Sequence, residues 1–261
     1  MKQSSRGKEI STDFISTQLR SRNPSFIISA VSLRDKLRKG EDIVLVDVRN
    51  NGDFERCRIP CSINIPLPAI KTKIFLKSKF LVLINEGYRY QALELESEKL
   101  KEHGFKQVRI LGGGLNYWRD IGGPIEGDFF AMNNMNEVSP RDYFMDKHYD
   151  DWIAIDVSRA GGSNKLIPNA INISYLNNDD DFVVKLKRSL DEYQAGRLPY
   201  ILIFNENGQQ YKKIKRAIQT KQIKNVFYLK DGLEGYKAFL QAQTSGWHPH
   251  RRTVEKCMSC P

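Results

Sequence analysis

The sequence of 261 residues has no apolar run long enough to cross a membrane. Its first 25 residues are basic and polar, and they lack the continuous apolar core of a signal peptide. These absences predict a cytoplasmic protein without a membrane span, or an exported one if a leader has been removed ahead of Met1. Cysteine is scarce as well: the chain has four, which allow three pairings if all of them form disulfides.

Acidic residues are fewer than basic ones: the chain has 31 aspartates and glutamates and 41 lysines and arginines, so its net charge is +10. Such a charge attracts nucleic acid, acidic proteins or anionic surfaces without choosing among them. Between residues 212 and 224 acidic residues are missing, whereas six basic ones are present: Lys212, Lys213, Lys215, Arg216, Lys221 and Lys224. A solvated helix face is the favoured interpretation, since no aromatic residues interleave with the cations. Binding of nucleic acid or another polyanion through this basic helix at 212–224 is the alternative.

One pattern occurs twice along the chain. The apolar residues 80–84 predict a strand buried on both faces, and a helical pattern follows that ends at Gly104; the same order returns from residue 200. A polar loop joins strand to helix in each copy, formed by Asn85, Glu86, Gly87, Tyr88 and Arg89 in the first and by Asn205, Glu206, Asn207, Gly208, Gln209 and Gln210 in the second. The amides of such a loop favour an anion or a thiolate, yet neither loop contains a cysteine.

The order of these elements predicts the domain organisation. Strands alternate with helices in each half, so we expect two small α/β domains, each a parallel sheet with helices on both faces. The expected segments are a flexible arm at 1–25, a first domain at 26–127, a linker of loop character at 128–135, a second domain at 136–246 and a C-terminal tail at 247–261.

A set of short motifs carries a family resemblance. In the first half they are Asp47-Val48-Arg49, Arg58-Ile59-Pro60, Asn64-Ile65-Pro66, the loop with Gly87 and Arg89, and Leu111-Gly112-Gly113 with Trp118. No single motif is specific, but their order recurs in the second half, and the chain resembles the rhodanese-like family over residues 26–126 and 136–244. The resemblance implies a tandem rhodanese-like protein linked to sulfur metabolism, with no cofactor.

The resemblance also implies a catalytic cysteine that this chain lacks. In the family the loop runs Cys-x-x-Gly-x-Arg, and its cysteine carries sulfur as a persulfide. Counting back from the loop glycines places Ile84 and Asn205 at the cysteine, with loop length retained in both copies, while Gln210 replaces the arginine. Neither side chain can hold sulfur. We therefore expect a protein that is not an active thiosulfate sulfurtransferase but a binding or regulatory module. Its two loops would bind a small anion or a protein partner, or stay empty in a fold retained for stability.

Two of the cysteines flank the Arg58-Ile59-Pro60 turn. Cys57 and Cys61 stand where the family usually has glycines, and the second copy has Asn169 at the position of Cys61. Asparagine tolerates the left-handed conformation, so a tight turn is expected there. Cysteine gains nothing from that conformation, and two of them four residues apart suggest pairing. A disulfide ranks first, metal binding second and two unpaired thiols third.

The other two cysteines, Cys257 and Cys260, form a CxxC motif in the tail. Together with His248 and His250 they are candidate ligands for zinc or copper. A disulfide, a redox or sulfur-relay pair, and a disordered end with incidental thiols are the other interpretations. A sulfurtransferase or thiol-redox protein that uses Cys257 and Cys260, or Cys57 and Cys61, is accordingly the alternative function.

Overall fold

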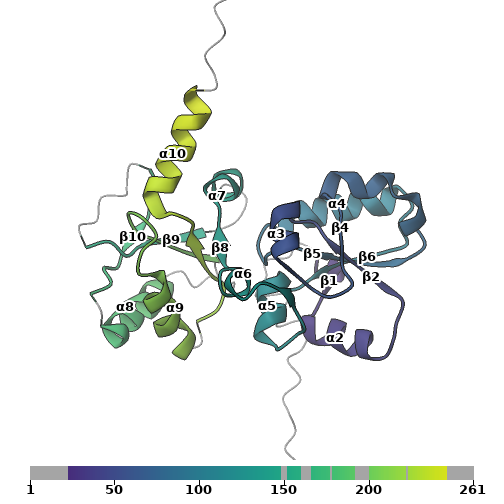
Figure 1. Ribbon diagram of the computed structural model, residues 1–261, viewed down its shortest axis with the longest axis horizontal. Coiled ribbons are helices and arrows are strands. Elements are labelled where there is room, and N and C mark those ends of the chain that lie inside the picture. Colours follow the sequence, from purple (N-terminus) through teal and green to yellow (C-terminus); the bar gives the residue numbers. More distant parts are fainter. Residues whose placement is uncertain are drawn as a thin grey trace, which may run out of the picture.

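The computed structural model describes residues 23–147, 152–159, 166–176, 178–191, 200–221 and 223–245. The expected tail at 247–261, with His248, His250, Cys257 and Cys260, lies outside these ranges, as does nearly all of the expected arm. Two five-stranded parallel sheets form the two halves of the protein and stand side by side (Figure 1).

The first domain is built on the sheet order β1-β6-β5-β2-β4. Its strands are β1 (Ile27–Ile28), β2 (Ile43–Asp47), β4 (Ile63–Asn64), β5 (Phe80–Ile84) and β6 (Gln107–Leu111). Its helices are η1 (Pro24–Phe26), α2 (Ala30–Arg38), α3 (Asn51–Arg56), η2 (Leu67–Thr72), η3 (Ile74–Leu76), α4 (Tyr90–Glu102) and α5 (Gly114–Asp120). A small antiparallel pair joins β3 (Cys57–Arg58) to β7 (Glu126–Gly127). Helices α2 and α5 lie on one face of the parallel sheet and α4 on the other (Figure 1).

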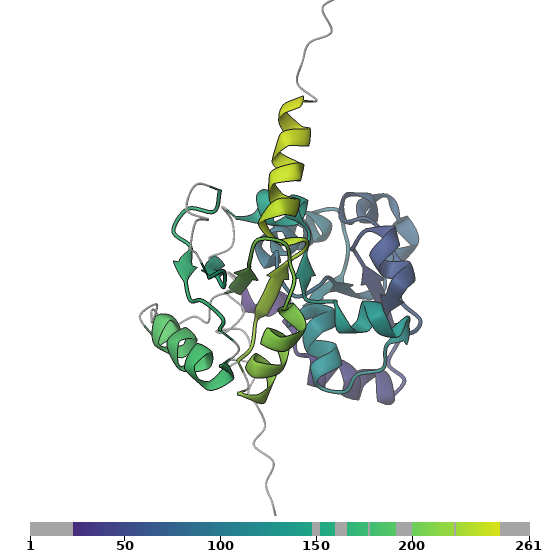
Figure 2. The same cartoon turned by 60° about the vertical axis from the view of Figure 1, so that its left-hand side comes forward.

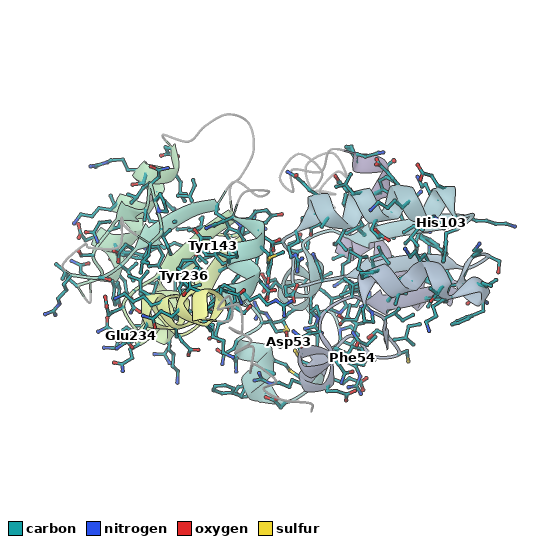
Figure 3. The ribbon with its side chains drawn as sticks, turned by 90° about the horizontal axis from the view of Figure 1, so that it is seen from above. Asp53, Phe54, His103, Tyr143, Glu234 and Tyr236 are labelled. Atoms are coloured by element: carbon teal, nitrogen blue, oxygen red, sulfur yellow. The ribbon has the colours of Figure 1, made fainter. Side chains whose placement is uncertain are left out.

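The second domain repeats this topology, with the sheet order β10-β9-β11-β12-β8. Its strands are β8 (Glu137–Val138), β9 (Trp152–Asp156), β10 (Ile171–Asn172), β11 (Tyr200–Phe204) and β12 (Val226–Leu229). Its helices are α7 (Pro140–Asp146), α8 (Asp179–Asp191), α9 (Tyr211–Thr220) and α10 (Gly232–Ser245). Helices α7 and α10 cover one face of the sheet, where Tyr143 packs edge-on against Tyr236 with ring centroids 5.5 Å apart (Figure 3), and α8 and α9 cover the other.

The segment 128–135, expected to be a loop, contains a short helix, α6 (Phe129–Asn133). Asp128 explains its start, because its carboxylate oxygen accepts a hydrogen bond from the backbone N–H of Ala131 at 2.6 Å. A side chain that satisfies an N–H group of the first turn is the usual reason for a helix to begin at aspartate. The connection between the domains is therefore partly helical.

Equivalent side chains fasten the edge strand of each sheet. The amide nitrogen of Asn64 donates to the carbonyl oxygens of Asp47 and Arg49, each at 2.9 Å, and Asn172 donates to those of Asp156 and Ser158 at 3.1 and 3.2 Å. The turn ahead of this strand needs a positive φ in both copies, 63° at Cys61 and 63° at Asn169. This confirms the turn that the asparagine predicted.

Replacing Asn64 tests whether its side chain fastens the edge strand of the first sheet. Asn64→Ala removes one donor from the Arg49 carbonyl and one of the two donors of the Asp47 carbonyl, which keeps the N–H of Ile65, so we expect the free energy of unfolding to fall by about 1–3 kcal/mol. Urea unfolding measures the change. The control is Asn51→Ala, which alters an exposed asparagine at the start of α3. Equal losses in the two variants would contradict the assignment.

Candidate functional site

The two loops that follow the central strands differ in length. Ile84 is the last residue of β5 and pairs with Asp47, whereas Phe204 is the last residue of β11 and pairs with Asp156. The residue after each strand is therefore an asparagine, Asn85 in the first copy and Asn205 in the second.

Backbone hydrogen bonds support this alignment, since Leu115 donates to the Asn85 carbonyl at 2.8 Å and Leu233 to the Asn205 carbonyl at 2.9 Å. Pairing Ile84 with Asn205 was thus wrong by one residue. Equal loop length was wrong as well, because the second loop has an additional residue between Glu206 and Gly208. Counting from the glycine missed this, whereas the end of the apolar run would have shown it. Ile84 itself is a fully buried strand residue.

Each asparagine side chain closes its own loop. The carboxamide oxygen of Asn85 accepts the N–H of Gly87 at 3.0 Å, and its amide donates to the carbonyl of Tyr88. In the second loop the oxygen of Asn205 accepts the N–H of Gly208 at 2.7 Å, and its amide donates to the carbonyl of Gln209 at 2.5 Å. In an open loop of this kind the backbone N–H groups are available to an anion. Here the N–H groups of Gly87 and Gly208 are bonded to asparagine side chains of the same loop.

Glycine turns after β6 and β12 close the loops from the opposite side. A Cβ atom on Gly114 would lie 2.4 Å from the nitrogen of Gly87, and one on Gly232 would lie 2.5 Å from the carbonyl oxygen of Asn205. Both distances are far below van der Waals contact, so only glycine fits. The backbone of the turn takes up space beside the loop in both domains.

Tyr88 and Arg89 of the first loop reach across to the second domain. The ring of Tyr88, only 1% exposed, packs edge-on against Trp152 and Phe227 with centroids 5.7 and 5.3 Å away. The guanidinium Nε of Arg89 lies 2.9 Å from a carboxylate oxygen of Asp146, whose side chain is 7% exposed. The charges of Asp146 and of its helix neighbour Asp142 raise the pKa of Arg89 despite the opposing effect of burial. This loop is an interdomain contact.

The second loop lies mostly at the surface. Glu206, Asn207, Gln209 and Gln210 are exposed, and Gln210 takes the left-handed conformation ahead of α9 that Arg89 takes ahead of α4. The side chain of Gln210 does not cap α9. The two copies therefore share a backbone but place their loops in different surroundings.

A cavity of about 280 Å³ lies where the domains meet, close to Asp53 (Figure 3). Both domains and α6 contribute to its wall, which is formed by Arg49, Asn50, Asp53, Arg56, Cys57, Glu86, Tyr88, Phe130, Ala131, Asn134, Met135, Glu137, Ser139, Asp142 and Lys230. Most of these side chains are polar or charged. The site is thus suited to a small polar molecule.

The first domain contributes several ionisable side chains to this wall, among them Arg49, Glu86 and Cys57. Arg49 is buried and forms a bidentate pair with Asp47, its Nη2 lying 2.7 Å from a carboxylate oxygen; burial lowers its pKa, but Asp47 outweighs that effect. Burial raises the pKa of Glu86 to about 7, although the cation of Arg49 acts against the increase. Burial also raises the pKa of the Cys57 thiol, so this cysteine is protonated at neutral pH.

The cysteines do not pair as expected. Cys57 and Cys61 are both free, and the predicted disulfide between them is not formed. Cys57 packs into the hydrophobic core of the first domain at 3% exposure, whereas Cys61 is exposed in the turn. In the described ranges no group of three histidine, cysteine or acidic residues is placed to hold a metal ion. None of the helices described has the length and apolarity to cross a bilayer.

Shortening Tyr88 tests the interdomain contact. Tyr88→Ala removes a buried ring from a cluster shared by both domains, so we expect a loss of about 3–5 kcal/mol and unfolding in two separate transitions. Urea unfolding followed by fluorescence and by circular dichroism measures both effects. Tyr88→Phe keeps the ring contacts and should unfold in one transition, and a single transition in both variants would argue against the contact.

The raised pKa of Glu86 predicts a pH dependence of stability. The folded protein binds a proton at Glu86 up to about pH 7, whereas an unfolded glutamate releases it near pH 4.5. The contribution of this group is greatest below pH 4.5 and is lost as the pH rises through 7. Glu86→Gln removes this loss, so we expect the variant to gain on the order of 1–3 kcal/mol over the wild type between these pH values. A difference between the two proteins that does not change with pH would contradict the assignment.

Comparison with known proteins gives the following matches. Residues 29–121 match the family model described as the rhodanese-like domain. The uncharacterized protein BU052 of Buchnera aphidicola is 30% identical over 90 residues, which is 32% of this chain, and the match spans 60% of the length of that curated relative.

Solved structures match as well. The BH2092 protein of Bacillus halodurans has 32% identity and a TM-score of 0.36 over 40% of this chain and 77% of that one. A thiosulfate sulfurtransferase of Pseudomonas aeruginosa has 16% identity and a TM-score of 0.35 over 82% of this chain and 42% of that one. The sequence match to the family model covers the first domain, whose loop, turns and sheet order are described above. Residues 29–121 of the first domain therefore match the rhodanese-like domain family.

Proposed function

We propose that this protein is a non-catalytic rhodanese-like binding module whose ligand occupies the cavity between its domains. One observation carries the proposal: both loops are closed by their own asparagine side chains, Asn85 and Asn205. The positions where sulfur chemistry would begin hold amides, and these amides already bond the loop N–H groups. Neither loop offers a thiol or an open anion site.

The interdomain cavity provides a space in which a ligand could bind, whereas the two closed loops do not. Glu86 and Lys230 both line it, and neither forms an ion pair with any residue that the structure describes. A carboxyl group and an ammonium group on one wall favour a small ligand that carries both hydrogen-bond donors and acceptors. Because the wall comes from both domains, such a ligand would also strengthen their contact.

The sulfur-handling alternative depends on the thiols. Cys57 is the thiol on the cavity wall, and its raised pKa leaves it protonated and weakly nucleophilic. The raised pKa of Cys57 and the packing of its side chain among core residues together favour a structural role for this cysteine. The tail cysteines are tested by the same experiment.

Transfer of sulfur from thiosulfate to cyanide tests the proposal. We expect the full chain to show no transfer above background, because no activated thiol among the described residues faces either loop. Asn205→Cys is the positive control: it places a thiol in the longer loop and frees the N–H of Gly208, so mass spectrometry should detect one added sulfur atom after thiosulfate treatment. Transfer by the wild type would overturn the proposal. Its loss in Cys57→Ser, or in Cys257→Ser with Cys260→Ser, would then identify the thiols responsible.

A further inference from the structure

Two helices of the second domain, α8 and α9, lie side by side on one face of the sheet (Figures 1 and 2). They run in opposite directions, because Lys221 at the end of α9 pairs with Asp180 at the start of α8 at 2.9 Å. On α8, Arg188 comes eight residues after Asp180. On α9, Lys213 comes eight residues before Lys221. At a rise of about 1.5 Å per residue, Arg188 and Lys213 therefore lie level on adjacent helices.

This arrangement gathers cations at one end of the helix pair. We call the exposed residues Lys187, Arg188, Lys212, Lys213 and Arg216 the basic face. One acidic residue, Asp191, lies at the same end of α8. The other acidic residues of α8 occupy its first turn, at the opposite end, where Asp180 pairs with Lys221 and Asp181 with Lys185 at 2.7 Å. With Asp191 counted, the basic face and its surroundings carry a net charge of about four, estimated from one charge per side chain; the carboxylate of Glu206, ahead of α9, lies 4.0 Å from Lys237.

The run of six basic residues between 212 and 224 divides into two groups. Lys215 lies 3.5 Å from a carboxylate oxygen of Glu137 and over the ring of Tyr228, and Lys224 lies over the ring of Tyr117 at 5.6 Å. Lys221 forms the ion pair with Asp180 described above. Lys215, Lys221 and Lys224 therefore have a structural role. Lys212 and Arg216 form no ion pair with any described residue, and both are exposed.

Helix stability does not account for the basic face. Lys212 and Lys213 follow directly on the first residue of α9, Tyr211, where the helix dipole is positive and disfavours cations. Lys212 and Arg216 are also four residues apart, a spacing at which like charges repel on a helix. Lys212 and Arg216 are therefore placed where their charges oppose the formation of α9. A binding partner of opposite charge would offset that repulsion.

The chemistry of the surface indicates which partner fits. The exposed residues of α9 are Lys212, Lys213, Arg216, Gln219 and Thr220, none of them apolar, and Val184 is the exposed large apolar residue of α8. A protein interface would need an apolar or aromatic anchor at its centre. A phosphodiester backbone gains affinity from cations alone, through the release of its counterions. We propose that the basic face binds the phosphate backbone of a nucleic acid duplex without base specificity, independently of the interdomain cavity.

Salt dependence tests the proposal directly. The full chain is titrated into fluorescent DNA and RNA duplexes of mixed sequence while anisotropy is measured. With about four phosphates contacted, the affinity should fall about 150-fold between about 50 and 200 mM salt. The variant with Lys212→Gln, Lys213→Gln and Arg216→Gln should lose most of the affinity, and the slope of log affinity against log salt should become about three units shallower. The same variant should unfold at an equal or higher temperature, which a structural role of these residues would not produce.

The matched control carries Lys39→Gln, Lys71→Gln and Lys106→Gln, which remove three exposed charges from the first domain. It should keep the affinity of the wild type. Equal losses in both triple variants would show that net charge alone binds the duplex and would overturn the proposal. So would binding that does not weaken with salt. Binding of anionic phospholipid vesicles or of an acidic peptide, lost in the α9 variant and not matched by either duplex, would show that the partner class is wrong.

Discussion

The contact of Tyr88 and Arg89 with the second domain determines how the rest of the molecule is arranged. Tyr88 enters an aromatic cluster that includes Trp152 and Phe227, and Arg89 pairs with the buried carboxylate of Asp146. Removing Arg89 would take this cation away from a carboxylate that is 7% exposed, so the geometry at this point is constrained. Glu86 precedes these residues, and the cavity opens beside them. The position of the cavity is therefore a consequence of the interdomain contact.

The same loop differs from the open loop that the rhodanese-like resemblance implies. An open loop would present its N–H groups to a bound anion or thiolate. Here Asn85 and Asn205 provide those N–H groups with an internal acceptor. The two domains reach the same closed state although their loops differ in length, which indicates that the asparagine, rather than the loop length, closes each hollow.

The sequence predicted the fold well because the fold depends on local patterns. Apolar runs located the central strands, and Asn169 indicated the turn whose φ of 63° it shares with Cys61. Tyr88 gave no such signal, since its partners are 64 or more residues away and only packing brings them together. Counting from a glycine also placed the loops one residue out of alignment. The expected disulfide failed for a related reason, since spacing in the sequence does not report where each thiol points.

The unequal surroundings of the two loops have a consequence for how the chain tolerates change. In the loop 85–89 a substitution alters the cohesion of two domains, whereas in the loop 205–210 most side chains are exposed and touch little. The loop 205–210 should therefore tolerate substitutions, insertions and surface labels, whereas the loop 85–89 should tolerate them poorly. A fold that contains the same unit twice thus has one loop that is constrained by its contacts and one that tolerates change.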